Sequence, residues 1–435
     1  MKANNSLGLI FFPAFDWAIS PSHPEREERL LYTQDQLFEE GIADIEGIHF
    51  FNPGLAGPAD VERVHFAYPD PDSIVTESHY IAAGGVMRAL DAVMSGETDK
   101  AFAMVRPPGH HAQRVTYGDR GFCIINIEAV GLEYIRQKYP DLRVAIVDTD
   151  CHHGDGTQDI YWNDPDTLFI SFHQDGRTLY PGTGDMNELG GPGAYGYTLN
   201  IPLPPNTGDE GFLHVLDNVV LPVLDDYKPD LIINSAGQDN HYTDPLTNMN
   251  FSAQGYALLN EKLNPDVAVL EGGYSIEGAL PYVNLGIVLA MAGLDYSGVR
   301  EPDYYEGKWR QSLRVSRQVE EISDQILKKW KNREKLAAEK FRGRQKVTLP
   351  RQVYYDTAGI MESQQQEFKI CADCPGLNVI HSANDRGDSL IGIQIPRRAC
   401  PACQAEGYRL FEETGKMKVK GRFLQDKTGN KYFSA

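Results

Sequence analysis

Short apolar runs alternate with longer amphipathic segments along the first two thirds of the chain. The runs are too short for helices and are rich in β-branched residues, which favours buried strands of a parallel sheet. The segments between several runs have the length and period of helices. This alternation predicts an α/β domain with a mainly parallel sheet. The predicted strands are Leu9–Phe12, Ala101–Val105, Val144–Val147, Leu168–Phe172, Leu231–Asn234 and Val267–Leu270, and the predicted helices include Glu77–Met94, Asn126–Lys138 and Gly211–Tyr227.

The pattern changes near residue 300. Lys308–Arg342 is highly charged, with apolar residues at roughly helical spacing, which predicts a long surface helix that docks on the first domain. Residues 347–435 carry two Cys-x-x-Cys pairs and read as a separate region. We therefore expect a main domain over 1–300, a charged helical linker over 301–346 and a small C-terminal region over 347–435.

Composition narrows the possible binding partners and cellular compartment of the protein. The chain has 435 residues and a formal net charge of −20, which argues against a broad nucleic-acid-binding surface. No stretch approaches the ~18 apolar residues of a membrane span. Six cysteines in a chain of this length do not make a disulfide scaffold. We expect a cytoplasmic protein that binds neither membrane nor nucleic acid, and the sequence leaves a homo-oligomer open.

Polar residues follow the central predicted strand. Asp148, Asp150 and His152 lie two apart, so in an extended backbone their side chains leave one face. Buried carboxylates are costly without a cation, and two oxygens with an imidazole suit zinc. Asp244, which is held extended by Pro245, is the expected third ligand, leaving a vacant position as in catalytic zinc sites. The alternatives are an Asp-rich capping loop and a simple Asp-Pro turn.

Further candidate groups follow other strands. His110 and His111 come after a rigid Pro-Pro-Gly turn, and Asp148 and Asp155 are candidate partners that would orient their imidazoles. Tyr274 follows two glycines, and its phenol could donate to a developing oxyanion. Taken alone, the histidine pair and the tyrosine would more often have structural roles. Gathered at the carboxyl ends of parallel strands, they predict an active site.

The motifs RPPGHH, DTDCHHGDG, SAGQDNHYTDP and EGGY, in this order, resemble the histone deacetylase family of the arginase/deacetylase superfamily. The resemblance covers residues 9 to about 295 and is closest to class II and bacterial members. It implies a three-layer α/β fold and a zinc-dependent enzyme that hydrolyses the amide of an acetylated or acylated amine, foremost acyl-lysine, and releases acetate. An acylated-amine substrate is thus the expected partner.

The resemblance also implies residue roles. Asp150, His152 and Asp244 would bind the catalytic zinc, and His111 would activate the attacking water and then protonate the leaving amine. The other expected assignments are His110 as the orienting imidazole, Asp155 and Asp148 as partners of His111 and His110, Tyr274 as the oxyanion donor, Gly121, Phe122 and Tyr180 as channel walls, Phe251 as a neutral rim residue, Arg29 behind the site near an acetate exit, and a potassium site at Asp148, Asp150, His152, Ser171 and Phe172.

The C-terminal region carries its own metal signal. Cys371, Cys374, Cys400 and Cys403 form two paired knuckles, which predict a tetrahedral structural zinc in a zinc-ribbon-like region. A redox-active Cys-x-x-Cys is the competing interpretation. A structural appendage is favoured over a docking module, although nearby basic residues keep the second possibility open.

Three other functions stay in view. One is an adaptor that binds acyl-lysine without turnover. Another is an amidohydrolase of acetylpolyamines or small acetamides, against which Phe251 argues because an acidic rim residue would suit those cations. A third is a two-metal ureohydrolase, but the histidine pair occupies the space where bridging carboxylates would lie.

Overall fold

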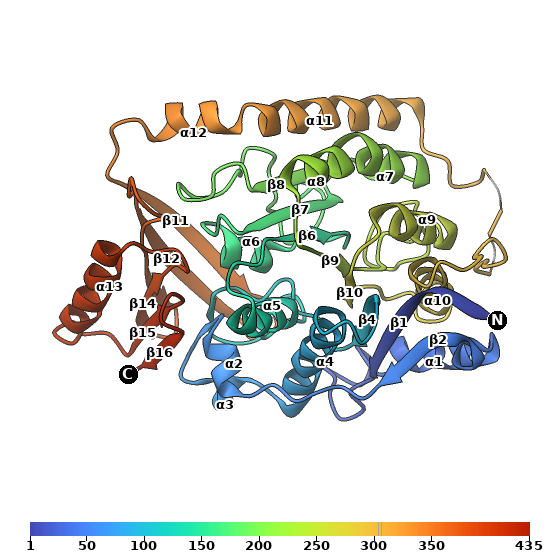
Figure 1. Ribbon diagram of the computed structural model, residues 1–435, viewed down its shortest axis with the longest axis horizontal. Coiled ribbons are helices and arrows are strands. Elements are labelled where there is room, and N and C mark those ends of the chain that lie inside the picture. Colours follow the sequence, from blue (N-terminus) through green and yellow to red (C-terminus); the bar gives the residue numbers. More distant parts are fainter. Residues whose placement is uncertain (303, 306) are drawn as a thin grey trace.

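A parallel sheet of eight strands forms the centre of the computed structural model, which describes residues 1–302, 304–305 and 307–435 (Figure 1). The strand order is β2-β1-β4-β10-β9-β6-β7-β8, and every neighbouring pair is parallel. This confirms the predicted α/β class. The strands are β1 (Lys2–Phe12), β2 (Glu46–Phe51), β4 (Lys100–Val105), β6 (Val144–Asp148), β7 (Thr167–Gln174), β8 (Thr198–Leu203), β9 (Leu231–Ala236) and β10 (Val267–Leu270).

The two edge strands are the ones that the apolar pattern does not reveal. β2 is partly exposed and reads Glu-Gly-Ile-His-Phe-Phe, and β8 contains Asn200 and Pro202. Proline lacks the N–H that a central strand needs, so it is tolerated at a sheet edge. The six predicted strands all lie within observed strands.

Helices cover both faces of the sheet, so the domain has three layers. Alternate residues of one strand enter different cores: Val147 of β6 packs with α7 to α11, whereas Ile146 packs with α4 and α5. The helices are α1 (Glu28–Glu39), α2 (Pro58–Glu62), α3 (Pro71–Ile74), α4 (Glu77–Met94), α5 (Ile127–Lys138), α6 (Asp155–Tyr161), α7 (Asp209–Val215), α8 (Leu221–Tyr227), α9 (Ala253–Leu263) and α10 (Leu280–Met291), with short turns at Ile42–Asp44 and Leu216–Val220 and a two-stranded sheet of β3 (Phe66–Ala67) and β5 (Val115–Thr116).

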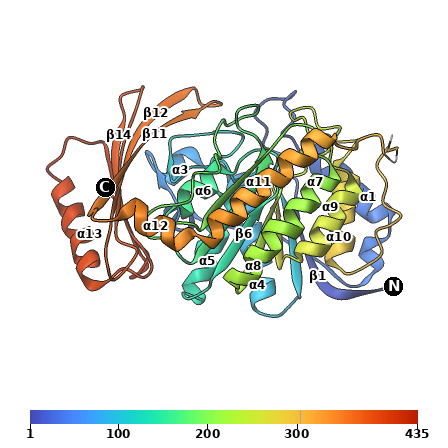
Figure 2. The same ribbon diagram turned by 90° about the horizontal axis from the view of Figure 1, so that it is seen from above.

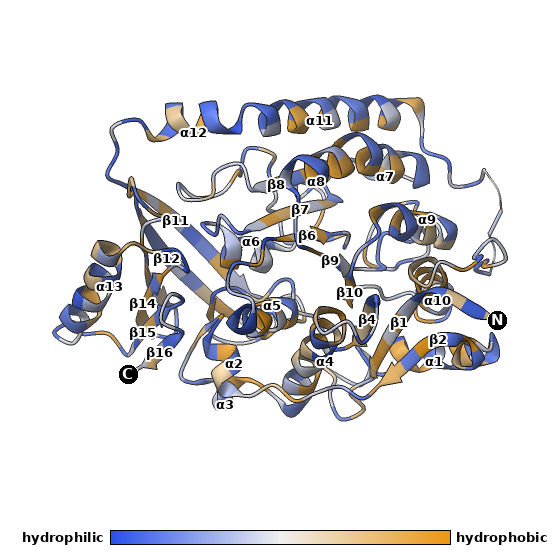
Figure 3. Ribbon diagram, viewed as in Figure 1, coloured by the Kyte–Doolittle hydropathy of each residue, from blue (hydrophilic) through white to orange (hydrophobic). Residues whose placement is uncertain are grey.

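The charged segment forms two helices along the outside of the domain, α11 (Leu313–Lys331) and α12 (Arg333–Phe341) (Figure 2). α11 packs on α7 and β8 and buries Val319, Ile326 and Trp330 in the main core. The indole Nε1 of Trp330 donates to Asp226 at 2.9 Å. Hydrophilic and hydrophobic residues mix along the helix, as an amphipathic docking helix requires (Figure 3).

The C-terminal region is a six-stranded sheet, order β11-β12-β13-β14-β15-β16, with one helix on it. β11 to β14 form an antiparallel meander, and the connection through α13 makes β14 and β15 parallel. The elements are β11 (Lys346–Tyr355), β12 (Ile360–Lys369), β13 (Asn378–Asn384), β14 (Ser389–Ile395), α13 (Pro401–Thr414), β15 (Gly421–Asp426) and β16 (Lys431–Ser434). The four cysteines lie in the loop after β12 and at the start of α13.

This sheet is more extensive than the small region expected from the sequence. On β12, the three central buried positions, between Ile360 and Phe368, are occupied by Glu362, Gln364 and Gln366. Apolar alternation, the main signal of a strand, is therefore missing although the burial alternates. Among the described helices, none has the length and apolar character needed to cross a bilayer.

Candidate active site

The carboxyl ends of β4, β6, β9 and β10 meet at one edge of the sheet. The loops that follow these strands bring His110, Asp150, Asp239 and Tyr274 into one neighbourhood. This is the position at which open parallel sheets bind ligands. Five of the predicted catalytic and metal-binding residues line a single pocket: His110, His111, Asp150, His152 and Tyr274.

Asp150, His152 and Asp239 form a group of three potential metal ligands with donor atoms within 4.8 Å of one another. The Nδ1 atom of His152 lies 2.7 Å from Oδ2 of Asp239 and 3.3 Å from Oδ1 of Asp150. Both carboxylates are fully buried. Burial and the Asp150 charge raise the pKa of Asp239. Two buried carboxylates that face one imidazole need a cation, and this donor set fits zinc.

The third member of this group is Asp239, which the sequence analysis did not name. The predicted third ligand, Asp244, stays a prediction; its carboxylate is buried and accepts the backbone N–H groups of Leu246 and Tyr274 at 2.9 and 2.7 Å. A signal for Asp239 was present in the sequence, because this residue follows shortly after the end of β9. Close packing supports the arrangement: a Cβ on Gly237 would lie 2.0 Å from an Asp150 oxygen.

The histidine pair is held by the two expected carboxylates. Nδ1 of His111 lies 2.9 Å from Asp155, and Nδ1 of His110 lies 3.2 Å from Asp148. Burial and the neighbouring His110 lower the pKa of His111 to about 3. Burial alone would lower the pKa of His110, but Asp150 and Asp148 outweigh it and raise that pKa. Environments that push two pKa values apart separate their acid and base roles.

Three buried side chains that the sequence analysis missed support the pair. Oε2 of Glu271 accepts the backbone N–H groups of Gly109 and His110 at 2.7 and 3.1 Å. The guanidinium of Arg120 and the amide of Gln113 donate to Asp155 at 2.8 and 2.9 Å. Arg120 directly precedes the expected channel residues, but the sequence gives no indication that a single arginine in a loop is buried.

Gly121, Phe122 and Tyr180 line the same pocket, as expected. The Tyr180 ring lies edge-on to His111, with 5.2 Å between centroids, and the Phe122 ring lies 5.6 Å from that of Tyr274. Phe122 has φ of +68°, which is costly for a bulky residue and is found mainly at functional sites. The pocket is open at Tyr180 and Leu246, both 37 % exposed, and closed at Asp150.

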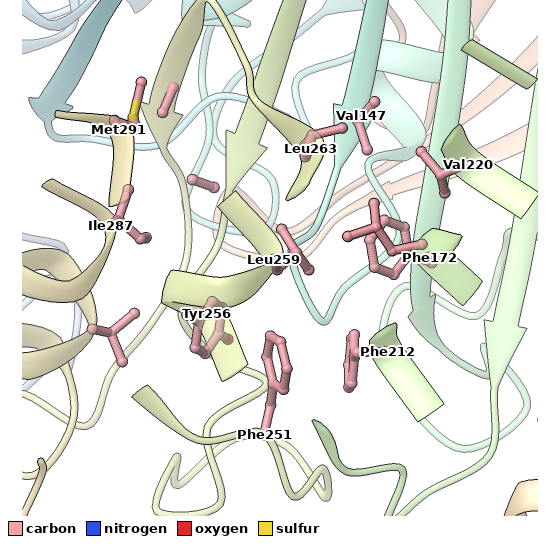
Figure 4. Packing of buried hydrophobic residues seen from close by; sticks show 14 of the residues in the cluster. Val147, Phe172, Phe212, Val220, Phe251, Tyr256, Leu259, Leu263, Ile287 and Met291 are labelled. Atoms are coloured by element: carbon pink, nitrogen blue, oxygen red, sulfur yellow. The ribbon is translucent and has the colours of Figure 1, made fainter. Parts of the chain in front are cut away.

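The structure contradicts the expectation that Phe251 is a rim residue. Its side chain is fully buried and stacks on Phe212 with 4.4 Å between ring centroids, next to Tyr256 (Figure 4). The loop after Asp244 turns Phe251 inward, where it joins the main core. The exposed apolar residue in this part of the pocket is Leu246.

Arg29 lies behind Tyr274, with its guanidinium carbon 4.9 Å from the ring centroid, but it does not line the pocket. It donates to the carbonyl oxygens of Gly273 and Glu271 at 2.7 and 2.6 Å and pairs with Glu25. These contacts fix the backbone that carries Tyr274.

Two further metal sites were predicted, one for potassium in the main sheet and one for zinc in the C-terminal region. Ser171 lies opposite Asp148 in the sheet, and its hydroxyl contacts Nδ1 of His173 at 2.8 Å. The potassium site with Phe172 stays a prediction. In the C-terminal region, Sγ atoms of Cys371, Cys374, Cys400 and Cys403 lie within 4.8 Å of one another, a geometry suited to tetrahedral zinc.

The sheet and the pocket at its carboxyl edge define the class: an α/β protein with its ligand site at the ends of parallel strands. Comparison with known families is more specific, because residues 67–284 match the histone deacetylase domain. The chain belongs to the histone deacetylase family. It is therefore a deacetylase or amidohydrolase of an acylated amine.

Individual relatives agree with the assignment to this family. A probable deacetylase of Archaeoglobus fulgidus is 45 % identical over 72 % of this chain and 95 % of its own length. A histone deacetylase-like amidohydrolase of Pseudomonas aeruginosa is 36 % identical over 51 % of this chain and 60 % of its own. The crystal structure of the HDA15 HD domain superposes with a TM-score of 0.65 at 25 % identity, covering 77 % of this chain and 98 % of that one.

Proposed function

We propose that this protein is a zinc-dependent deacetylase that hydrolyses the amide of acyl-lysine and releases acetate. One observation carries the proposal: Asp150 and His152, which form a potential metal-ligand group with Asp239, line the pocket that also holds the histidine pair and Tyr274. An amide is a poor electrophile, and its amine is a poor leaving group. Hydrolysis therefore needs a Lewis acid, a base and an oxyanion donor together.

Zinc held by the three donors would act as the Lewis acid that polarises the amide carbonyl and promotes ionisation of water. His111 presents Nε2 to the pocket because its Nδ1 is committed to Asp155. Nε2 accepts a proton from the attacking water and then donates it to the leaving amine. His110, oriented by Asp148, holds the water and stabilises negative charge.

Tyr274 would donate its phenol hydrogen to the oxyanion of the tetrahedral intermediate. The low exposure of this residue, 7 %, strengthens such a hydrogen bond because water is largely excluded. The rings of Phe122 and Tyr180 suit a narrow, apolar aminoalkyl chain between the mouth and the metal group.

The test measures acetate release from an acetyl-lysine peptide by the purified full chain. Activity should disappear on chelation and return with zinc, and His111→Ala should lose it while keeping the far-UV circular dichroism of the native chain. Acetate release at the wild-type rate by His111→Ala would refute the assignment. Peptide binding without any acetate release would instead support the adaptor function.

Four further proposals accompany this one. A second, structural zinc would bind the four cysteines, so that the chain holds two zincs in all. Potassium would bind near Asp148 and Ser171. The protein would act in the cytoplasm. The division at residues 300 and 346 would separate the catalytic domain, a helical linker and the C-terminal region.

A further inference from the structure

The turn between β11 and β12 reaches the pocket from the C-terminal region. Asp356, the first residue of this turn, lines the same pocket as His111, Tyr180 and Tyr274. Its Oδ1 atom accepts the backbone N–H of Gly121 at 2.9 Å and the hydroxyl of Tyr180 at 3.4 Å. A residue far outside the matched segment 67–284 thus completes the pocket wall.

This turn is anchored firmly by the hairpin behind it. The Tyr355 hydroxyl donates to the carbonyl oxygen of Val115 at 2.7 Å, and the Ala358 N–H donates to that of Asp119 at 3.3 Å. One apolar cluster joins both parts of the chain, containing Phe66, Val115 and Tyr117 from the catalytic domain and Val353, Tyr355, Ile360, Ile380, Leu390 and Phe423 from the C-terminal sheet. The pocket wall is therefore part of a packed interface.

A polar chain also links the hairpin to the histidine pair. Arg351 donates to Oε1 of Gln113 at 2.9 Å, and Nε2 of Gln113 donates to Asp155 at 2.9 Å. Asp155 in turn contacts His111. The C-terminal region thus contacts the site both at its mouth and behind His111.

Asp356 places an accessible negative charge at the mouth. It is half-buried, and among the described residues only Gly121 and Tyr180 hydrogen-bond to its carboxylate, both at Oδ1. The second oxygen, Oδ2, is left for a group from outside the chain. Burial and the neighbouring carboxylates of Asp356 and Glu25 raise the pKa of Asp119 to about 7, as expected for a negative field.

Resting on the proposed deacetylase function, we infer that Asp356 is a specificity-determining residue that favours acyl-lysine with a positively charged amino group beyond the aliphatic chain. The Tyr180 ring lies against His111 on one side and its hydroxyl meets Asp356 on the other. A substrate chain that runs along this ring from the histidine pair ends beside the carboxylate. A free α-ammonium group at that end forms a charge-assisted hydrogen bond.

A matched pair of substrates isolates the charge. Nε-acetyl-lysine amide carries the α-ammonium group, and 6-acetamidohexanamide is the same molecule without the amino group. We expect wild-type kcat/KM for acetate release to be about five- to tenfold higher for the cationic substrate, the size of one partly exposed charge pair. The preference should appear mainly in KM and should shrink as salt is raised.

Asp356→Asn should remove the preference, because the charge is lost, whereas the amide oxygen of the new side chain can still accept the Gly121 N–H. The control is Asp385→Asn, which makes the same change in net charge in the exposed turn after β13 and should keep the preference. Equal losses on both substrates in Asp356→Asn, or no preference in the wild type, would overturn the inference while leaving the deacetylase function supported. Failure to release acetate from either substrate or from the peptide would overturn both.

Discussion

Glu362 provides a quantitative test of how the C-terminal sheet docks on the catalytic domain. Its carboxyl group is fully buried next to this interface, and burial raises its pKa to about 7 from the ordinary 4.5. The Tyr355 hydroxyl lies 2.7 Å from the Val115 carbonyl oxygen and 3.0 Å from Oε2 of Glu362. Because this hydroxyl has one hydrogen, a protonated Glu362 can supply the second hydrogen bond.

The sign of the pH dependence follows from the raised pKa. The folded state holds the proton more tightly than the unfolded state, so ionisation costs stability as the pH rises from 4.5 to about 7. The full loss is reached above pH 7. The difference between the two pKa values corresponds to about 3 kcal/mol. Glu362→Gln cannot ionise, and its amide can donate to the Tyr355 oxygen.

We therefore expect Glu362→Gln to be more stable than the wild type by about 3 kcal/mol at pH 8 and by less than about 1 kcal/mol at pH 5. Urea unfolding of the full chain, followed by circular dichroism at both pH values, measures the difference. Glu367→Gln on the more exposed side of β12 is the control and should show no such pH-dependent gain. An equal effect of Glu362→Gln at both pH values would refute the reasoning.

Two predictions address the proposed catalytic groups. Tyr274→Phe should lower kcat for acetate release by about 10²- to 10³-fold with little change in KM, because only the oxyanion donor is lost; kcat equal to that of the wild type would rule out this role. Asp239→Asn should reduce bound zinc from two ions per chain to one, whereas Asp244→Asn should retain both; elemental analysis decides, and the reverse pattern would assign the third ligand to Asp244.

Local patterns revealed much of the catalytic domain. The central strands are short and apolar, so their burial on both faces of the sheet could be predicted. Polar loops follow them, so the site at their carboxyl ends could be predicted as well. Asp150 and His152 could be predicted because they follow β6 directly and lie two residues apart, which places both side chains on one face of an extended backbone. The contacts of His111 with Asp155 and of His110 with Asp148 also agree with the predicted pairs.

Loop geometry was harder to predict. Asp239 and Asp244 lie in the same loop, and only the path of the backbone decides which carboxylate faces His152. Phe251 illustrates the same difficulty, since its distance along the chain from Asp244 does not say whether the ring faces solvent or Phe212. In both cases a few backbone torsions determine the outcome, and these depend on packing against other elements.

By itself, the sequence determined the α/β class, the edge of the sheet that carries the site and most of the reactive side chains, because these depend on local periodicity and on residue chemistry. Only the tertiary structure placed Asp239 beside His152, buried Phe251 in the core and brought Asp356 to the pocket. The polar residues Glu362, Gln364 and Gln366 of β12 are buried where the C-terminal sheet packs on the catalytic domain. The role of the β11–β12 hairpin therefore depends on contacts between residues more than two hundred positions apart.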